Sequence, residues 1–229
     1  MTTALCLENS GDDASKKKDH DSPCFIRQDN FEFCGYSLKI AMGVNLGVSA
    51  YVWDSGIALC RYFEKEKISF TGKKVIELGS GTGIVGILVT LLGGAVTMTD
   101  QPDTLKQIEY NVSTNIPTAS RHRLKVRPLT WGEDQTNFPT DYDFILGSDI
   151  VYSSVTYPSL IRTLHYLANQ GTTIYLSSEF RKGNGSLSFH EVLLPEYFNC
   201  LVVDRLEDKD ITVYKMTRIS TSPEIGLRA

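Results

Sequence analysis

The sequence contains no apolar run of the roughly 18 residues that a membrane-spanning helix needs. Its 23 basic residues are outnumbered by 27 acidic ones, so it lacks the basic excess of a nucleic-acid-binding protein. Its five cysteines form no C-x-x-C pair, which argues against a disulfide framework or a zinc site. The four histidines show no metal-ligand spacing either, so we expect no bound metal. With no signal-peptide layout, the chain is predicted to be cytoplasmic, with a nuclear or centrosomal pool left open.

The length of 229 residues, 41% of them hydrophobic, predicts one domain with a substantial core. Residues 1–24 are polar and charged, and we expect a disordered leader there. Residues 25–220 are predicted to form the single domain, and residues 221–229 a flexible tail. The sequence has no internal repeats, and it contains no linker that would indicate a second domain.

Strand-like and helix-like segments alternate along the chain, which predicts an α/β fold with a doubly wound sheet. Two apolar runs near the end have no long helix between them and predict an antiparallel hairpin. The sheet is thus expected to have seven strands, mostly parallel, with helices on both faces. Before it, alternating apolar residues from Phe31 to Ile40 predict a short β-hairpin, and residues 50–65 an amphipathic helix. Strands are expected near 73–78, 95–99, 123–129, 143–148, 172–177, 198–204 and 211–217, and helices near 83–92, 102–114, 157–168 and 186–194.

The most informative motif is an apolar strand, Val75–Leu78, that leads into the glycine-rich turn Gly79–Gly83. A second strand ends in Asp100. This arrangement is typical of a nucleoside site, where backbone groups approach the ligand and a carboxylate binds the ribose hydroxyls. Gly81–Gly86 also satisfies the dinucleotide pattern G-x-G-x-x-G, a weak signal by itself.

Glu77 favours one nucleoside over another, because a carboxylate beside the glycine turn would repel a pyrophosphate. It would instead suit S-adenosylmethionine, which carries a sulfonium and an ammonium group. We therefore expect a methyl donor, with a dinucleotide oxidoreductase as one alternative. A glycine turn that merely packs a helix against a strand is the other.

Several other residues are expected at the carboxyl edge of the sheet, where such folds bind ligands. Asp100 either binds the ribose or caps the helix that follows it. Trp131 either stacks on adenine or packs in the core. Trp53 lies at helical spacing with other apolar residues, so its position favours core packing.

The segment from Ser148 to Tyr152 follows the fourth strand, where methyl donor and acceptor should meet. Asp149 is expected to accept a hydrogen bond from an amine and orient it, and Tyr152 to wall the channel. The alternative is that Asp149 caps a turn and Tyr152 is a core residue. The loop 178–185 either touches the substrate or is simply solvated.

Together these motifs resemble the methyltransferase-like 21 family of seven-β-strand protein-lysine methyltransferases, which have a class I, Rossmann-like fold. The resemblance extends over about residues 31–217 and rests on the segments Phe33–Gly35, Leu46–Val48, Val52–Asp54, Gly72–Gly79, Gly81–Leu88, Leu129–Gly132 and Asp149–Tyr152. The last of these matches the D-x-x-Y signature of the family.

The resemblance implies that Trp53 contacts S-adenosylmethionine, against the expectation from spacing. It implies further cofactor contacts from Gly79, Ser80 and Gly81, from Asp100 at the ribose, and from Trp131 and Ser148 around adenine. The implied reaction methylates a lysine of a folded protein, translation elongation factor 1-alpha, and leaves S-adenosylhomocysteine.

Several alternatives to this implied function stay open from sequence alone. They are a different protein substrate such as a chaperone or AAA-ATPase, a small amine, RNA, and a scaffold that binds its partner without turnover. We expect a monomer that binds neither nucleic acid nor membrane.

Overall fold

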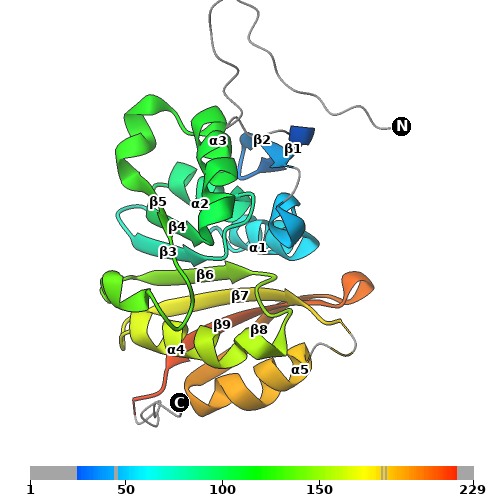
Figure 1. The fold of residues 1–229 in the computed structure, drawn as a ribbon, viewed down its shortest axis with the longest axis vertical. Helices are drawn as coiled ribbons and strands as arrows, with labels where there is room; N and C mark the ends of the chain where they lie inside the picture. The colour runs from blue at the N-terminus through cyan, green and yellow to red at the C-terminus, as the bar shows by residue number, and fades with distance from the viewer. Residues whose placement is uncertain (1–24, 44–45, 182, 184, 221–229) are drawn as a thin grey trace, which may run out of the picture.

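The computed structural model describes residues 25–220 except 44–45, 182 and 184 (Figure 1). The leader predicted over 1–24 and the tail predicted over 221–229 lie outside the described residues. No helix in the described part of the chain is long and apolar enough to cross a membrane.

Seven strands form one sheet in the order β5-β4-β3-β6-β7-β9-β8 (Figure 1). All neighbouring strands are parallel except β9, which runs antiparallel to both β7 and β8. The predicted mostly parallel sheet with a C-terminal antiparallel hairpin is therefore confirmed. The strands are β3 (Lys74–Leu78), β4 (Ala95–Asp100), β5 (Leu124–Pro128), β6 (Phe144–Ser148), β7 (Thr173–Glu179), β8 (Phe198–Leu206) and β9 (Ile211–Arg218).

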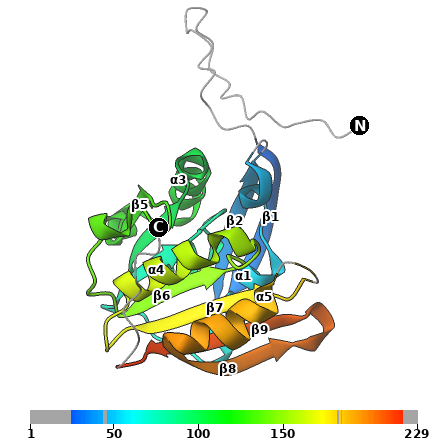
Figure 2. The same cartoon turned by 60° about the horizontal axis from the view of Figure 1, so that its bottom comes forward.

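Helices cover both faces of the sheet, as predicted. Three of them enclose one apolar core with the N-terminal hairpin, and these are α1 (Asp54–Lys65), α2 (Ile84–Leu91) and α3 (Leu105–Asn115). The second core lies under α4 (Tyr157–Leu167) and the segment that begins with α5 (Ser186–Ser188), which Figure 2 shows over the near face of the sheet.

The segment predicted as one helix near 186–194 is instead three short pieces. After α5, a π-helical turn spans Phe189–Leu193 and a 3-10 turn spans Leu194–Glu196. Pro195 lacks the backbone N–H that would continue a regular α-helix, which accounts for the tight turn at its end.

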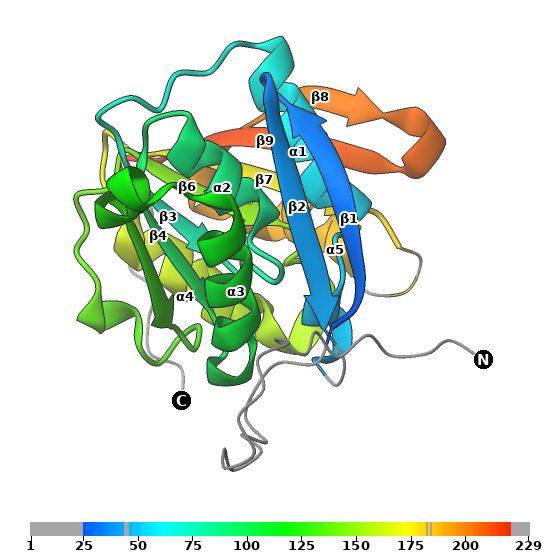
Figure 3. The same ribbon diagram turned by 90° about the horizontal axis from the view of Figure 1, so that it is seen from above.

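The predicted N-terminal hairpin is a separate two-stranded sheet of β1 (Phe25–Phe33) and β2 (Tyr36–Gly43), antiparallel to each other. Figure 3 shows it lying beside α3 and α1, apart from the main sheet. Cys34 and Gly35 form its turn, both with positive φ, of 53° and 78°. Two consecutive residues of this kind match the twist of a tight hairpin.

Amide side chains of α3 hold the edge of β2. Gln107, Asn111 and Asn115 are four residues apart on the helix, and each accepts a hydrogen bond from a backbone N–H of β2. Four helical residues rise about 6 Å and two strand residues about 6.8 Å, so the two rows stay nearly in step. The row satisfies an edge that would otherwise carry free backbone groups.

Asn111 is the central member of this row and is fully buried. Its Oδ1 accepts the N–H of Ala41 at 2.8 Å, and its Nδ2 donates to the carbonyl oxygens of Ala41 and Thr82, both at 2.9 Å. Gln107 donates in the same way to the carbonyl of Ser49 at 2.8 Å. The row therefore joins the hairpin to the glycine turn and to the segment before α1.

Glu77 on β3 is placed differently from the sequence-based expectation. Its side chain is 1% exposed and lies beneath α2, where a Cβ on Gly86 would come within 2.5 Å of its Oε2 atom. Burial raises the pKa of Glu77 to about 8, which the neighbouring Ser80 hydroxyl and Gly86 N–H only partly oppose. The prediction that this carboxylate faces a cationic ligand is thus corrected, because the helix covers it.

Replacing Asn111 by leucine should destabilise the fold strongly. The substitution leaves a buried N–H and two buried carbonyls without partners, and each such group costs about 1–3 kcal/mol. We expect the free energy of unfolding to fall by about 3 kcal/mol, measured by urea denaturation. The matched variant Asn115→Ala, at the half-buried end of the row, should lose about 1 kcal/mol. Equal losses of unfolding free energy in the two variants would contradict the central role of Asn111 in this row.

Replacing Glu77 by glutamine should change how stability depends on pH. The folded-state pKa of about 8 lies above the ordinary 4.5, so the contribution of Glu77 to stability is complete below pH 4.5. It is lost as the pH rises through 8. Between about pH 5 and pH 8.5, we expect wild-type protein to lose on the order of 3 kcal/mol more than E77Q in chemical denaturation. Parallel pH dependence of the two proteins would rule this out.

Candidate functional site

A cavity of about 370 Å³ opens at the carboxyl ends of β3, β4 and β6. This is where the strand order reverses, since the chain continues from β3 to β4 on one side and reaches β6 on the other. Every predicted site residue except Glu77 lines it. These are Trp53, Gly79, Ser80, Gly81, Asp100, Trp131, Ser148, Asp149 and Tyr152.

The glycine turn forms one wall of the cavity. Gly79 and Gly81 have positive φ, of 62° and 55°, a backbone conformation that residues with a side chain rarely adopt. A Cβ on Gly79 would lie 2.8 Å from the Cγ2 of Ile150 and 3.4 Å from the ring of Trp131. A side chain at Gly79 would therefore not fit, and the turn brings its backbone to the wall of the cavity.

Asp100 lies at the end of β4 and faces the glycine turn. Its Oδ2 accepts the N–H of Gly81 and its Oδ1 the N–H of Gln101, both at 2.7 Å. Burial raises the pKa of Asp100, and these two N–H groups oppose the rise. The residue at the start of the following helical turn is Gln101, without a side-chain cap. The Thr104 side chain is a third hydrogen-bond partner of Asp100, which leaves the carboxylate acceptor capacity for a ligand hydroxyl.

Two aromatic side chains continue the walls. Trp131 is half-buried and packs against the second core. Tyr152 is 43% exposed, so it is not a core residue and its ring borders the cavity. Burial of its hydroxyl, with the charge of Asp100, raises the pKa of Tyr152.

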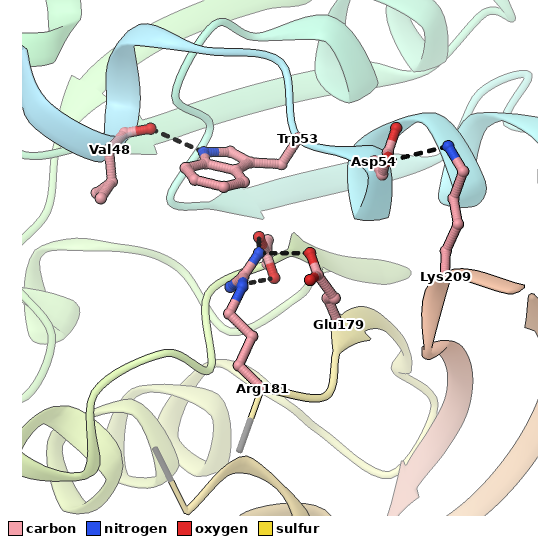
Figure 4. A network of polar contacts seen from close by, with 7 residues as sticks. Val48, Trp53, Asp54, Glu179, Arg181 and Lys209 are labelled. Carbon is pink, nitrogen blue, oxygen red and sulfur yellow. Dashed lines mark hydrogen bonds and ion pairs between the residues drawn. The ribbon is translucent and has the colours of Figure 1, made fainter. Parts of the chain in front are cut away.

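Trp53 also borders the cavity, and its predicted core position is wrong. It is 38% exposed and precedes α1 in extended conformation, so the helical spacing does not apply to it. Its indole N–H donates to the carbonyl of Val48 at 2.8 Å (Figure 4). This bond fixes the ring at the mouth of the cavity.

Asp149 follows β6 in left-handed conformation, with φ of 55°, and its side chain is only 4% exposed. Both of its carboxylate oxygens accept hydrogen bonds from Arg181, Oδ1 at 3.2 Å and Oδ2 at 2.6 Å. The second guanidinium nitrogen also donates to Glu179 at 2.7 Å. Figure 4 shows Arg181 beneath the ring of Trp53, with the guanidinium carbon 5.0 Å from the ring centroid.

Arg181 lines the cavity, so the loop after β7 reaches it. Sequence reasoning did not identify the segment before α1, whose Val48, Ser49 and Tyr51 also line the cavity. No spacing marks these residues, since their position depends on the bond from Gln107 to Ser49.

The cavity combines polar and aromatic groups in one space. The glycine turn and Asp100 suit the hydroxyls of a nucleoside at one end, and a buried carboxylate among aromatic rings suits an amine at the other. Among the described residues, no three histidine, cysteine or acidic side chains lie close enough together to hold a metal ion.

Comparisons with known proteins agree with this geometry. The model of a family described as lysine methyltransferase matches residues 34–194. The EEF1A lysine methyltransferase 3 of Xenopus tropicalis is 52% identical over 199 residues, covering 86% of this chain and 88% of the relative. The Mus musculus protein of the same name is 46% identical, covering 87% and 86%.

Solved structures with low sequence identity share the fold. A Thermus thermophilus 16S rRNA methyltransferase, in complex with AdoMet and guanosine, matches with a TM-score of 0.62 at 14% identity. The match covers 84% of this chain and half of that one. The glycopeptide N-methyltransferase MtfA, in complex with S-adenosylhomocysteine, gives a TM-score of 0.57 at 14% identity, covering 74% and 91%.

These structural matches confirm the predicted class I methyltransferase fold. The family model spans more than half of the chain, and the relatives are similar over nearly their whole length. The chain belongs to the lysine methyltransferase family.

Proposed function

We propose that this protein transfers a methyl group from S-adenosylmethionine to the ε-amine of a lysine in translation elongation factor 1-alpha. The observation that carries the proposal is that the two parts of the site share one cavity. The glycine turn and Asp100 line one part, and Asp149 and Tyr152 line the other.

The first part fits the nucleoside of the donor. Gly79–Gly81 leave room for the ligand against the backbone, and Asp100 has acceptor capacity left for a ribose hydroxyl. Trp131 and Ser148 border the place where adenine would lie in this arrangement. When bound, S-adenosylmethionine supplies a methyl group on a positively charged sulfur, and the product is neutral S-adenosylhomocysteine.

The second part fits an uncharged lysine amine. Lysine attacks only after it loses its proton, and burial among the rings of Trp53 and Tyr152 favours that loss. Asp149 accepts a hydrogen bond from the amine and turns its lone pair toward the donor. Alignment of this kind can remove roughly 7–11 kcal/mol of the barrier. The chain's main contribution is thus orientation and exclusion of water.

The protein substrate is inferred from the relatives, whose names state that they methylate EEF1A. The net charge of −4 suits a basic partner better than an acidic one. We also propose that the protein acts as a monomer in the cytoplasm, where translation factors are found. The described cysteines are free thiols, in keeping with a reducing compartment.

Purified protein incubated with labelled S-adenosylmethionine and elongation factor 1-alpha should methylate a lysine, located by mass spectrometry. Asp100→Ala should reduce donor binding at least tenfold in calorimetry, because it removes the ribose acceptor and frees the Gly81 N–H. Transfer should fall with it. Normal transfer by this variant would contradict the cofactor site, and labelling only of other proteins would contradict the substrate.

Asp149→Asn should separate donor binding from catalysis. The amide keeps the shape of the side chain but loses the charge that orients the amine. We expect donor affinity within about twofold of wild type and a loss of transfer of about 100-fold, corresponding to roughly 3 kcal/mol. Calorimetry and single-turnover labelling measure the two quantities. If the variant loses donor binding instead, Asp149 belongs to the donor part of the site.

A further inference from the structure

We propose that Arg181 is a positioning residue that neutralises Asp149 and so keeps the incoming lysine amine uncharged. The inference rests on the proposed lysine methyl transfer and assigns a role within the same site. The evidence for it is a cluster of ion pairs at the mouth of the cavity, in which Arg181 binds both Asp149 and Glu179.

Arg181 and Asp149 form a close ion pair. Arg181 binds both oxygens of Asp149 in a forked arrangement, and the carboxylate is almost fully buried. Such forked pairs fix the orientation of a carboxylate as well as its charge. Asp149 is therefore held in one orientation before any substrate arrives.

The charge of Asp149 affects the protonation of a lysine amine that binds beside it. A bare carboxylate within about 4–6 Å would favour the charged ammonium, which cannot attack a methyl group. The positive charge of Arg181 opposes that effect at every relevant pH, since arginine does not lose its proton. Asp149 can then accept a hydrogen bond from the amine without holding it in the charged form.

Other charged and titratable groups also surround the position of the amine. Glu179, at the end of β7, shares the same guanidinium and is one-third exposed. Asp100 and the hydroxyl of Tyr152 face the cavity from β4 and from the segment after β6. Among the described residues that line the cavity, Arg181 alone is cationic, so without it that part of the lining would present only negative or neutral groups to the amine.

A separate ion pair on the rim provides a control. Lys209 and Asp54 are paired at 2.9 Å and both are about half-exposed. Figure 4 shows this pair beside the start of α1, away from the guanidinium of Arg181. Because neither residue lines the cavity, their charges should not influence the amine.

Trp53 limits where the guanidinium can go. Its ring lies over Arg181, and its indole is itself fixed by the bond to Val48. Stacking on an aromatic face suits the planar guanidinium better than a lysine ammonium. Arg181 is thus confined between an aromatic ring and two carboxylates, which is how a long surface side chain acquires one position.

The test is the pH dependence of methyl transfer to elongation factor 1-alpha by Arg181→Met. This variant keeps much of the side-chain length and removes the charge. We expect the midpoint of the rise in kcat/KM with pH to move upward by about one unit. Transfer at neutral pH should fall about tenfold and recover at high pH. Calorimetry with S-adenosylhomocysteine should show unchanged binding.

Three variants sharpen this result. Arg181→Lys keeps the charge and should keep the midpoint, even if loss of the fork lowers the rate. Glu179→Gln removes a negative charge and should move the midpoint downward. Lys209→Met removes a cation from the rim pair and should leave the profile unchanged.

The outcomes separate the inference from the function on which it rests. No transfer by the wild-type enzyme at any pH would overturn both. Wild-type transfer with an unshifted R181M profile would overturn the inference alone. So would faster transfer by R181M at neutral pH, which would mean that Arg181 competes with the substrate, or loss of S-adenosylhomocysteine binding, which would place Arg181 in the donor part.

Discussion

The reversal of strand order between β3 and β6 is the constraint on which the site depends. The two strands are hydrogen-bonded neighbours, but the chain leaves their carboxyl ends in opposite directions. The turn after β3 goes to α2 on one face, and the segment after β6 goes to α4 on the other. The space between these diverging segments is the cavity, so the residues proposed to bind the donor and the acceptor line one common space.

Negative charge in and beneath the cavity is compensated differently at each carboxylate. Backbone N–H groups serve Asp100, a guanidinium serves Asp149, and Glu77 is buried so deeply that its pKa rises to about 8. These differences matter because an uncompensated carboxylate near the amine would keep it protonated. They also assign different tasks to three acids that the sequence presents alike. In the proposed reaction, Asp100 serves the hydroxyls of the donor and Asp149 the amine, whereas Glu77 contacts neither.

The sequence predicted the sheet well because its strands are short apolar runs separated by clear turn and helix signals. It failed where direction or local conformation mattered. Trp53 has helical spacing with its neighbours, but it precedes α1 in extended conformation. Glu77 was placed beside a ligand because it is close to Gly79 in sequence, whereas α2 covers its side chain. The family to which the chain belongs supports a methyl donor, whereas the buried Glu77 does not.

Contacts between segments that are distant in the chain could not be predicted either, because local spacing and composition do not identify the partner segment. The row of Gln107, Asn111 and Asn115 has the spacing of any polar helix face, and only the fold shows that β2 lies against it. Arg181 belongs to a loop whose composition fits solvent equally well. Its position depends on Asp149, which is 32 residues away in the chain.

Asp149 links the two halves of the site mechanically as well as chemically. Its left-handed backbone precedes Ile150, which is almost fully buried and lines the cavity together with Asp149 and Tyr152. Ile150 fills the space left by the missing side chains of Gly79 and Gly147, since a Cβ on either would lie within 2.8 Å of it. The donor turn and the acceptor segment therefore share one packing contact. Because cores are closely packed, a shift of either segment would disturb this contact, which joins the two parts of the proposed site.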